Sequence, residues 1–465
     1  MTLVIIAIIL IGFVLIATSQ LTNVNRAAAA IIAGTVGWVL YICYGADFVM
    51  HEHAADYVDF LGGAVPTSSA VKDYVAQNVF IKYMSRGAEL VIFLLATMTI
   101  VEILDNNGCF DFFRKWATTR NSRKLLWILS LIAFVVSANI DTLTVATMLL
   151  VLMREMIPNR RQRMIYGSTI VLAANCGGAL TVIGDPTGLL LWTTGHVSAT
   201  SFSATLAIPC LLGWLIPTWW LSRQLPERID LQRGQMPYRG DDTNLSVMQR
   251  LLMLFVGIGG LWFIPSFRAI THLSPFLGSL CVLSVLWIVN EVMNRKLINS
   301  DQTIQRRTPR VLQYGVLQLM LFVMGVVLAV GVVQETGAIS WLSRQISLFA
   351  SSHYADGNNA SLQIWIMGAL SAMFSCVLDT FATAVSFFSL HENQQAALLL
   401  GENHIYWKVI AYSSAMGGNV LLLGSVSGLA LIKMEHIHVG WYLRNVGWVV
   451  ILTWLLGMCA IWLIG

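Results

Sequence analysis

Three aspartates stand inside long apolar stretches of this chain, each beside residues that interrupt a helix. Asp141 lies in SANIDT, Asp185 in NCGGALTVIGDPTG and Asp379 in SCVLDT. A carboxylate at membrane depth is energetically costly and therefore indicates a functional site. Carboxylate, hydroxyl, amide and carbonyl oxygens suit a hard cation such as Na⁺, and a desolvated carboxyl group can exchange a proton for that cation. The three aspartates thus indicate cation and proton chemistry.

Neighbouring polar residues complete the set of candidate ligands. Along the chain, the candidates are Asn139, Asp141, Thr142, Asn175, Asp185, Asp379, Thr380 and Asn419. We expect Asp141 and Asp379 to hold Na⁺ and the exchanged proton, with Asp185 assisting. Plainer roles stay open, since Asp141 and Asp379 also suit the cap of a following helix and Asp185 suits a turn. Asn175 and Asn419 also suit hydrogen bonds to loose backbone.

The composition excludes a soluble globular protein. Of 465 residues, 57% are hydrophobic and 11% are charged, whereas a typical soluble protein has about 25% charged residues. The apolar segments do not alternate in the way that a transmembrane β-barrel requires. We therefore predict an all-α polytopic membrane protein that is surrounded by the lipid bilayer and has no nucleic acid as a partner.

Apolar segments long enough to cross a bilayer, roughly 20 residues each, recur along the chain. They are expected near 2–19, 27–44, 86–104, 203–222, 248–265, 273–292, 311–333 and 441–463. Basic residues gather around 114–124, 154–163, 223–239 and 295–310, so these parts are expected in the cytoplasm. The loop 45–82 is rich in acidic residues and is expected outside. Because 124–154 is basic at both ends, it is expected to form a re-entrant hairpin with its tip near Ser137–Thr142.

Two blocks of the first half recur in the second half. FVVSANIDTLTVA (134–146) aligns with AMFSCVLDTFATA (372–384), and NCGGALTVIGDPTG (175–188) aligns with AMGGNVLLLGSVSG (415–428). The spacing agrees, because Gly184 follows Gly177 by seven positions and Gly424 follows Gly417 by seven positions. The charges place the helix that opens each half in opposite orientations. Inverted repeats with paired broken helices are typical of secondary transporters.

The repeats divide the chain into four expected parts. Residues 1–84 would form N-terminal scaffold helices and an external loop, and 85–223 the first inverted repeat, with a hairpin at 124–154 and a broken helix at 164–196. Residues 224–310 would form a cytoplasmic loop and linking helices. The second inverted repeat is expected at 311–465, with a hairpin at 360–391 and a broken helix at 404–432.

The chain resembles NhaD-type sodium/proton antiporters of the ion transporter superfamily in four blocks: TIVEILDNNGCFD, SANIDTLTVATML, AANCGGALTVIGDPTGLLLW and GGNVLLLGSVSGLALIKME. The resemblance covers most of 85–465 and implies a multi-pass protein of the bacterial plasma (inner) membrane. It also implies an elevator-type fold, with a homodimeric scaffold and a moving unit that holds both hairpins. Both tips differ from the family, because Asp141-Thr142 and Asp379-Thr380 stand where the family has Asp-Asn.

These observations predict a secondary active transporter, with no enzyme activity and no cofactor, that exchanges Na⁺ or Li⁺ for H⁺ by alternating access. The alternative is a Na⁺-coupled symporter of a small organic or inorganic anion on the same fold. That alternative predicts Ser-Asn-Thr tips or a basic residue in the site, and neither is evident from the sequence: no arginine or lysine lies in either break. An enzyme would need a nucleophile or a metal-ligand constellation, and we find none among the motifs.

Overall fold

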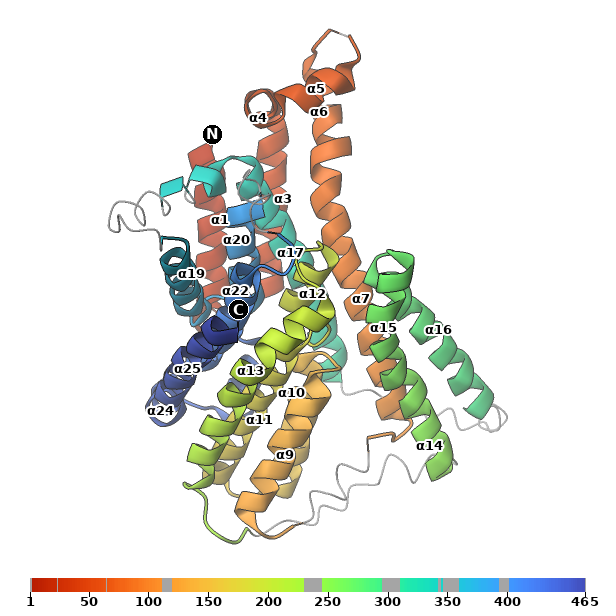
Figure 1. Cartoon of the computed structure of the whole chain (residues 1–465), viewed down its shortest axis with the longest axis vertical. Helices are drawn as coiled ribbons and strands as arrows, with labels where there is room; N and C mark the ends of the chain where they lie inside the picture. Colours follow the sequence, from red (N-terminus) through yellow and green to blue (C-terminus); the bar gives the residue numbers. More distant parts are fainter. Residues whose placement is uncertain are drawn as a thin grey trace.

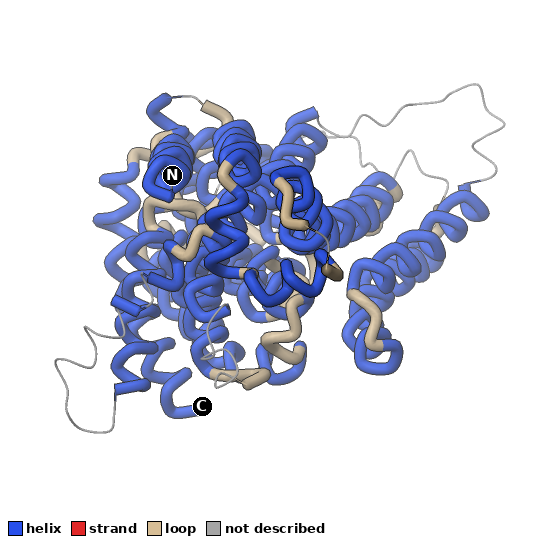
Figure 2. Tube along the Cα trace, turned by 90° about the horizontal axis from the view of Figure 1, so that it is seen from above, coloured by secondary structure: helices blue, strands red, loops and turns tan. Residues whose placement is uncertain are grey.

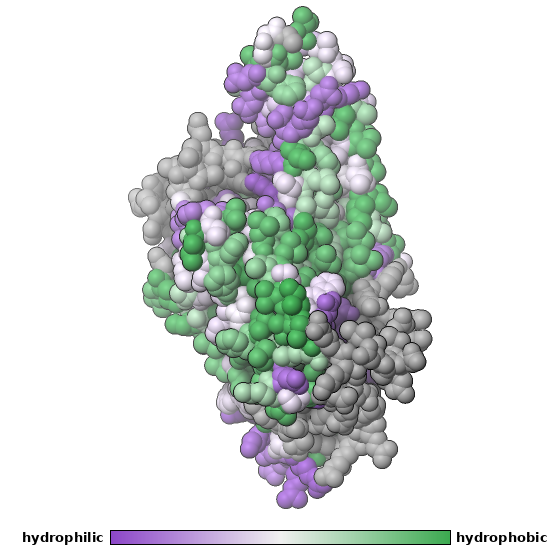
Figure 3. Space-filling model, turned by 90° about the vertical axis from the view of Figure 1, so that its right-hand side faces the viewer, coloured by the Kyte–Doolittle hydropathy of each residue, from purple (hydrophilic) through white to green (hydrophobic). Residues whose placement is uncertain are grey.

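The computed structural model describes the chain apart from residues 1, 23, 64, 111–118, 230–244, 295–309, 342–343, 346–358, 393–400 and 465. The described residues are helical (Figure 1) and contain no strand, only an isolated bridge between Asn121 and Arg228. They include eight helical segments that are long and apolar enough to cross a membrane. Figure 3 shows hydrophobic residues along the middle of one face and hydrophilic residues toward both ends. The predicted all-α polytopic architecture is confirmed.

The N-terminal helices pack tightly against a helix from the second half. The short helix α2 (Ser19–Thr22) joins α1 (Thr2–Ala17) to α3 (Arg26–Cys43), and α1 and α3 both contact α17 (Arg310–Glu335). A Cβ on Gly325 of α17 would lie 2.7 Å from the backbone nitrogen of Ile31 in α3, so the two backbones are in contact there. Small residues at such crossings let membrane helices associate by close packing, because the bilayer provides no hydrophobic drive between helices.

The segment 45–82, expected to be an external loop, is largely helical instead. It contains α4 (Gly45–Glu52), α5 (Ala54–Leu61), α6 (Ser68–Tyr74) and the π-helical turn η1 (Val75–Phe80), which stand at one end of the molecule (Figure 1). The helix α7 (Ile81–Asn106) continues from α6 and η1 without interruption, so this helical segment begins at Ser68 and not near residue 86. Its polar first turns extend past the apolar part, and hydropathy detects only the apolar part.

A lobe of two helical segments, one of them continuous over 247–271, stands beside α7 (Figures 1 and 2). It consists of α14 (Val247–Leu254), the π-helical turn η2 (Phe255–Gly259), α15 (Gly260–Thr271) and α16 (Pro275–Asn294). A Cβ on Gly257 would lie 2.8 Å from Leu104 Cδ1, so this glycine allows the lobe to approach α7 closely.

Two helical hairpins are present among the described residues. The first consists of α9 (Ser122–Ser137) and α10 (Thr142–Met156), and the second of α19 (Asn359–Ser375) and α20 (Thr380–Glu392). In each hairpin only four residues separate the two arms. Asp141 and Asp379 are the last residues of these tips, directly before the second arm.

Each hairpin is followed by an interrupted helix. The first consists of α11 (Arg160–Leu180) and α12 (Pro186–Thr193), and the second of α22 (Ile405–Leu421) and α23 (Val426–Glu435). The two run in opposite directions. Arg163 near the start of α11 pairs with Glu435 at the end of α23, with 2.9 Å between Nε and Oε2, while the Asn403 N–H before α22 donates to the His196 carbonyl beyond α12 at 2.8 Å.

Long helices pack around the two interrupted ones. The helix α13 (Ala199–Ser222) contacts α11 and α22, and the chain ends in α24 (Val439–Tyr442), the π-helical turn η3 (Leu443–Gly447) and α25 (Trp448–Ile464). The helix α25 packs against both α13 and α22. This surrounding layer buries the interrupted helices, as irregular backbone at membrane depth requires.

Candidate functional site

Each hairpin tip closes on the break in the interrupted helix of its own half. The Thr142 N–H and hydroxyl donate to the Gly184 carbonyl oxygen at 3.3 and 3.0 Å. In the second half, the Thr380 N–H donates to the Gly424 carbonyl oxygen at 3.0 Å. Equivalent positions thus make equivalent bonds, and these bonds satisfy carbonyl groups that the breaks leave without a helical partner.

A serine in the first arm of each hairpin makes a second matched contact. The Ser137 hydroxyl donates to the Ala174 carbonyl oxygen at 2.7 Å, and the Ser375 hydroxyl donates to the Ser414 carbonyl oxygen at 2.6 Å. Both serines are fully buried. The first arm of each hairpin is therefore fixed to the regular part of the interrupted helix, one turn or more before the break.

Glycine is required in both interrupted helices because hairpin backbone lies directly against them. A Cβ on Gly184 would lie 2.4 Å from a hairpin carbonyl oxygen, and a Cβ on Gly424 would lie 1.8 Å from one. A Cβ on Gly177 or Gly417 would lie equally close to a hairpin carbonyl oxygen, at 2.1 and 2.2 Å, yet both glycines lie within regular helix. The role of this second pair is therefore close approach and not interruption of the helix.

Both tips and both breaks line one small cavity. Its volume is about 50 Å³, which suits a small cation with a few waters, since one water needs roughly 10–15 Å³. Pockets for larger ligands have roughly 300–1,000 Å³. The lining residues are Asp141, Thr142, Leu143, Asn175, Asp185, Pro186, Leu319, Asp379, Thr380, Phe381, Ala415, Ser425, Val426 and Ser427. Six of the eight predicted ligands are among them.

All three aspartates of the cavity cap helices that begin there. Asp141 and Asp379 accept backbone N–H groups of α10 and α20 at 3.1 and 2.9 Å, and Asp185 accepts one of α12 at 3.0 Å. Ser425 caps α23 in the same way at 3.0 Å. The capping role is thus present at every position. A carboxylate that caps a helix can still coordinate a cation, because it has two oxygens with about four acceptor positions.

The three carboxylates surround the cavity without meeting at one point. Asp185 interacts electrostatically with both Asp141 and Asp379. Within the described ranges of the chain, no three Asp, Glu, His or Cys side chains form a group that could hold a metal ion. A cation here would therefore take at most two carboxylates and would need hydroxyl, amide or carbonyl oxygens as well. The amino ends of α10, α12, α20 and α23 supply partial positive charge that offsets the carboxylates.

Asn175 and Asn419 join the two halves at the cavity. The Asn175 amide donates to the Asn419 side-chain oxygen, and the Ser427 hydroxyl donates to Asn175 Oδ1 at 2.7 Å. Asn175 lines the cavity, whereas Asn419 lies outside its lining and is fully buried. Among the described residues, no acceptor contacts Asn419 Nδ2. The two asparagines therefore bind each other across α11 and α22, and not loose backbone as the plainer alternative proposed.

The predicted ligand Asn139 does not reach the cavity. Its amide donates to the Val135 carbonyl oxygen at 2.8 Å, and its side-chain oxygen accepts the indole N–H of Trp262 in α15. The side chain thus lies on the outer side of the tip and contacts the neighbouring lobe. Residue type alone does not predict which way a side chain points in an irregular turn.

A residue that the sequence reasoning did not select, Arg26, reaches the site from α3. Its Nη1 lies 3.6 Å from Asp379 Oδ2, and its Nη2 donates to the Leu423 carbonyl oxygen in the second break at 2.8 Å. The expectation that no basic residue stands at the site is therefore wrong. A signal was available, because Arg26 is the only charged residue before Asp47, and an ionisable residue at the edge of an apolar segment is a functional candidate.

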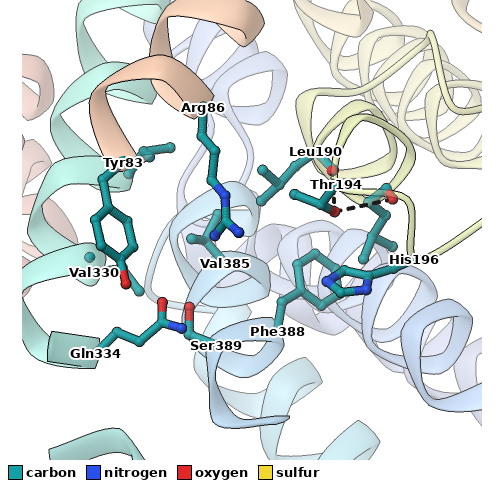
Figure 4. A pocket seen from close by; sticks show the side chains of 13 residues that line it. Tyr83, Arg86, Leu190, Thr194, His196, Val330, Gln334, Val385, Phe388 and Ser389 are labelled. Atoms are coloured by element: carbon teal, nitrogen blue, oxygen red, sulfur yellow. Dashed lines mark hydrogen bonds between the residues drawn. The ribbon is translucent and has the colours of Figure 1, made fainter. Parts of the chain in front are cut away.

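A second cavity, of about 30 Å³, lies between α7 and α17 on one side and α12 and α20 on the other (Figure 4). Figure 4 shows Arg86, His196, Gln334 and Ser389 around it. None of its lining residues is acidic. This cavity therefore lacks the carboxylate that a desolvated cation would need, and it does not compete with the first as a cation site.

Comparison with known proteins gives a family and several relatives. The family described as "Citrate transporter" (CitMHS) matches residues 1–417. Sodium/proton antiporters 1 and 2 of Arabidopsis thaliana are each 29% identical, over 77% and 78% of this chain and over 59% and 82% of their own lengths. The Na⁺/H⁺ antiporter NhaD of Vibrio cholerae is 28% identical over 78% of this chain and 75% of its own. The match thus spans about three-fifths of the first plant relative.

Proposed function

This chain belongs to the CitMHS family and is similar to NhaD-type sodium/proton antiporters, and from that premise we propose that it exchanges Na⁺ or Li⁺ for H⁺ across the membrane. It is a membrane transporter and not an enzyme. The observation that carries the proposal is the small cavity in which Asp141, Asp185 and Asp379 meet the ends of two interrupted helices and two hairpins. A buried carboxylate binds either a cation or a proton, and competition between them for one group produces exchange.

Each cavity residue has a distinct role in the proposal. Asp141 and Asp379 bind the cation and the exchanged proton, and Asp185 adds negative charge between them. Thr142 and Thr380 hold each tip against its break, so that the carbonyl groups of the breaks stay at the cavity. Asn175 supplies an amide oxygen. These oxygens replace the hydration shell of a small cation. The proposed exchange needs no cofactor.

Alternating access by an elevator movement of two inverted repeats is also part of the proposal. It is supported by the matched bonds of the two tips, by the paired glycines that contact hairpin backbone, and by the opposite directions of the interrupted helices. In this mechanism the hairpins and interrupted helices move as one unit. The helices α1, α3, α7 and α17, which pack together, form the scaffold.

The surroundings of the protein complete the proposal. The scaffold would pair with a second copy as a homodimer, in the plasma membrane of a bacterium, with the basic segments around 154–163 and 223–239 in the cytoplasm. The alternative, symport of a small anion, is not favoured. The family description refers to citrate, but the individual relatives compared above are named sodium/proton antiporters. The cavity lining is acidic, and Arg26 lies outside that lining with its charge directed at the Asp379 carboxylate.

Everted membrane vesicles with a pH-sensitive dye test the proposal. Vesicles containing the wild-type chain should release accumulated protons when NaCl or LiCl is added, and Asp141→Asn and Asp379→Asn should each abolish this response. Asp59→Asn, the same chemical change at an exposed position of α5, is the matched control and should respond as the wild type does. No response of the wild type at any neutral or alkaline pH would refute the function. Normal rates in both cavity variants would refute the site.

A further inference from the structure

The two matched aspartates of the hairpin tips differ in one respect, which is the guanidinium beside Asp379. Among the ion pairs formed by described residues, only that of Arg26 with Asp379 includes a carboxylate of the cavity. Asp141 instead accepts hydrogen bonds from the backbone N–H and the hydroxyl of Thr144, at 3.1 and 3.3 Å. Equivalent residues of the two halves thus have different charged surroundings.

The contact between Arg26 and Asp379 is buried but loose. Their side chains are 11% and 1% exposed, so water screens the two charges weakly. The 3.6 Å between Nη1 and Oδ2 exceeds a hydrogen-bond length, and neither atom has a hydrogen-bond partner among the described residues. The Asp379 oxygen that is not occupied by the helix cap therefore faces a positive charge without being bonded to it.

The arginine itself is held firmly from other directions. Its Nε donates to the Ser19 hydroxyl and its Nη2 to the Leu423 carbonyl oxygen, both at 2.8 Å. It stands at the first residue of α3, which packs on α1 and α17 and carries neither hairpin nor break. A fixed positive charge is thus presented to Asp379 from a helix outside the unit that holds the aspartate.

From this geometry we infer that Arg26 is a built-in competitor for the transported cation at Asp379 and so sets the apparent affinity for Na⁺. The inference rests on the proposed exchange function. When Asp379 holds no cation, the guanidinium balances its charge. Na⁺ must overcome that positive charge to bind at Asp379, whereas Asp141 offers a carboxylate without a competing ion pair. The second half of the site is therefore the weaker one for Na⁺.

Removing the charge should strengthen Na⁺ binding. An opposite charge within about 4–6 Å changes the proton affinity of a carboxylate by roughly tenfold to a thousandfold, and a competing Na⁺ experiences the same field. We therefore expect Arg26→Gln to lower the KM for Na⁺ by about tenfold or more, with a smaller change in the maximal rate. Arg26→Lys keeps the charge but lacks the planar fork that bonds Leu423, so its KM should lie between the two.

The matched control removes a different buried arginine. Arg163 pairs with Glu435 at 2.9 Å, with exposures of 18% and 1%, and it lies outside the cavity lining. Arg163→Gln therefore breaks a comparable ion pair without altering the charge at the cavity. It should reduce the melting temperature and leave the KM for Na⁺ unchanged. This control separates a loss of packing from a change in competition.

The experiment uses the purified full-length chain in proteoliposomes, with proton flux measured against Na⁺ concentration. A lower KM in Arg26→Gln, an intermediate KM in Arg26→Lys and an unchanged KM in Arg163→Gln would support the inference. Wild-type KM values in both Arg26 variants would overturn it while the exchange function stands. Absence of Na⁺-dependent flux in the wild type would instead refute the function itself. If Arg26→Gln does not fold, Arg26→Met decides, because it also removes the charge and keeps a long unbranched side chain, and a wild-type KM there overturns the inference.

Discussion

Gly424→Ala tests whether the second hairpin rests on the break in the way described. The added Cβ would lie 1.8 Å from the Ser375 carbonyl oxygen and 2.8 Å from that of Leu378, whereas a carbon and an oxygen in contact normally stand about 3.3–3.6 Å apart. The tip would have to withdraw by more than an ångström, because the opposing atoms are main-chain atoms that cannot rotate away. Overpacking of this kind costs about 1–3 kcal/mol, and we expect the upper end.

The same movement would disturb the site. It would break the bond from the Thr380 N–H to the Gly424 carbonyl oxygen and displace Asp379, the neighbouring residue of the tip. We therefore expect Gly424→Ala to lower the melting temperature in detergent and to abolish exchange in vesicles. The matched control is Gly440→Ala in α24, where a Cβ would meet nothing within 4 Å. If the two variants are equally stable and equally active, the tip does not pack on the break and the reasoning fails.

Three further predictions follow from single contacts. Asp185→Ser keeps a helix cap, because Ser425 caps the matching helix in the second half and Ser and Asp cap about equally well. We therefore expect an unchanged melting temperature but a slower Na⁺-driven proton flux. An unchanged flux would show that Asp185 only shapes the break. Asn175→Ala leaves two buried polar partners unpaired and should lower the free energy of unfolding by about 1–3 kcal/mol, whereas an unaltered unfolding curve would deny that the amide joins the halves. The hydrogen bond to Glu335 raises the pKa of His53. The pair therefore stabilises the fold fully below the ordinary histidine pKa, and this contribution is lost as pH rises through the raised value. His53→Gln should flatten the pH dependence of the melting temperature in that range, and an unchanged slope would contradict the pairing.

The transmembrane helices and the hairpin tips were predictable because local composition determines them. The expected span 27–44 corresponds to α3, Arg26–Cys43, and the expected tip at Ser137–Thr142 begins and ends where α9 ends and α10 begins. A bilayer requires long apolar helices, and a carboxylate within them is rare unless the structure uses it. Both signals are present in short windows of sequence.

The helices of residues 45–82 were not predictable in the same way. Residues 45–82 are polar enough to suggest a loop, yet α4, α5 and α6 form there. Hydropathy reports where a helix lies in lipid, and it does not report whether a helix continues beyond the bilayer. The side chain of Thr67 accepts from the Ala70 N–H at 3.1 Å and caps the extension, which is a local signal that a search for apolar spans overlooks.

Contacts between distant parts of the chain account for the rest of the site. Arg26 and Leu423 are 397 residues apart, and their hydrogen bond cannot be read from any local pattern. Asn139 is the opposite case, because local sequence selected a residue that does not reach the cavity. Its type and its place near Asp141 suggested a ligand, but its side chain contacts Trp262 on another lobe. Local sequence selects the elements that form a site, and the packing of those elements selects which side chains face it.

Repeated sequence does not produce repeated electrostatics, and this determines how the site can work. Asp141 and Asp379 occupy equivalent positions and cap equivalent helices, yet only Asp379 faces a guanidinium. At the breaks of the interrupted helices, Asp185 has an ionisable side chain where Ser425 has a neutral one, and both residues cap a helix. Unbalanced negative charge is therefore concentrated on the side formed by α10 and α12. In the proposed exchange, an arriving cation would be drawn first to that side, and binding at Asp379 would require competition with Arg26, so the asymmetry itself would order the binding steps.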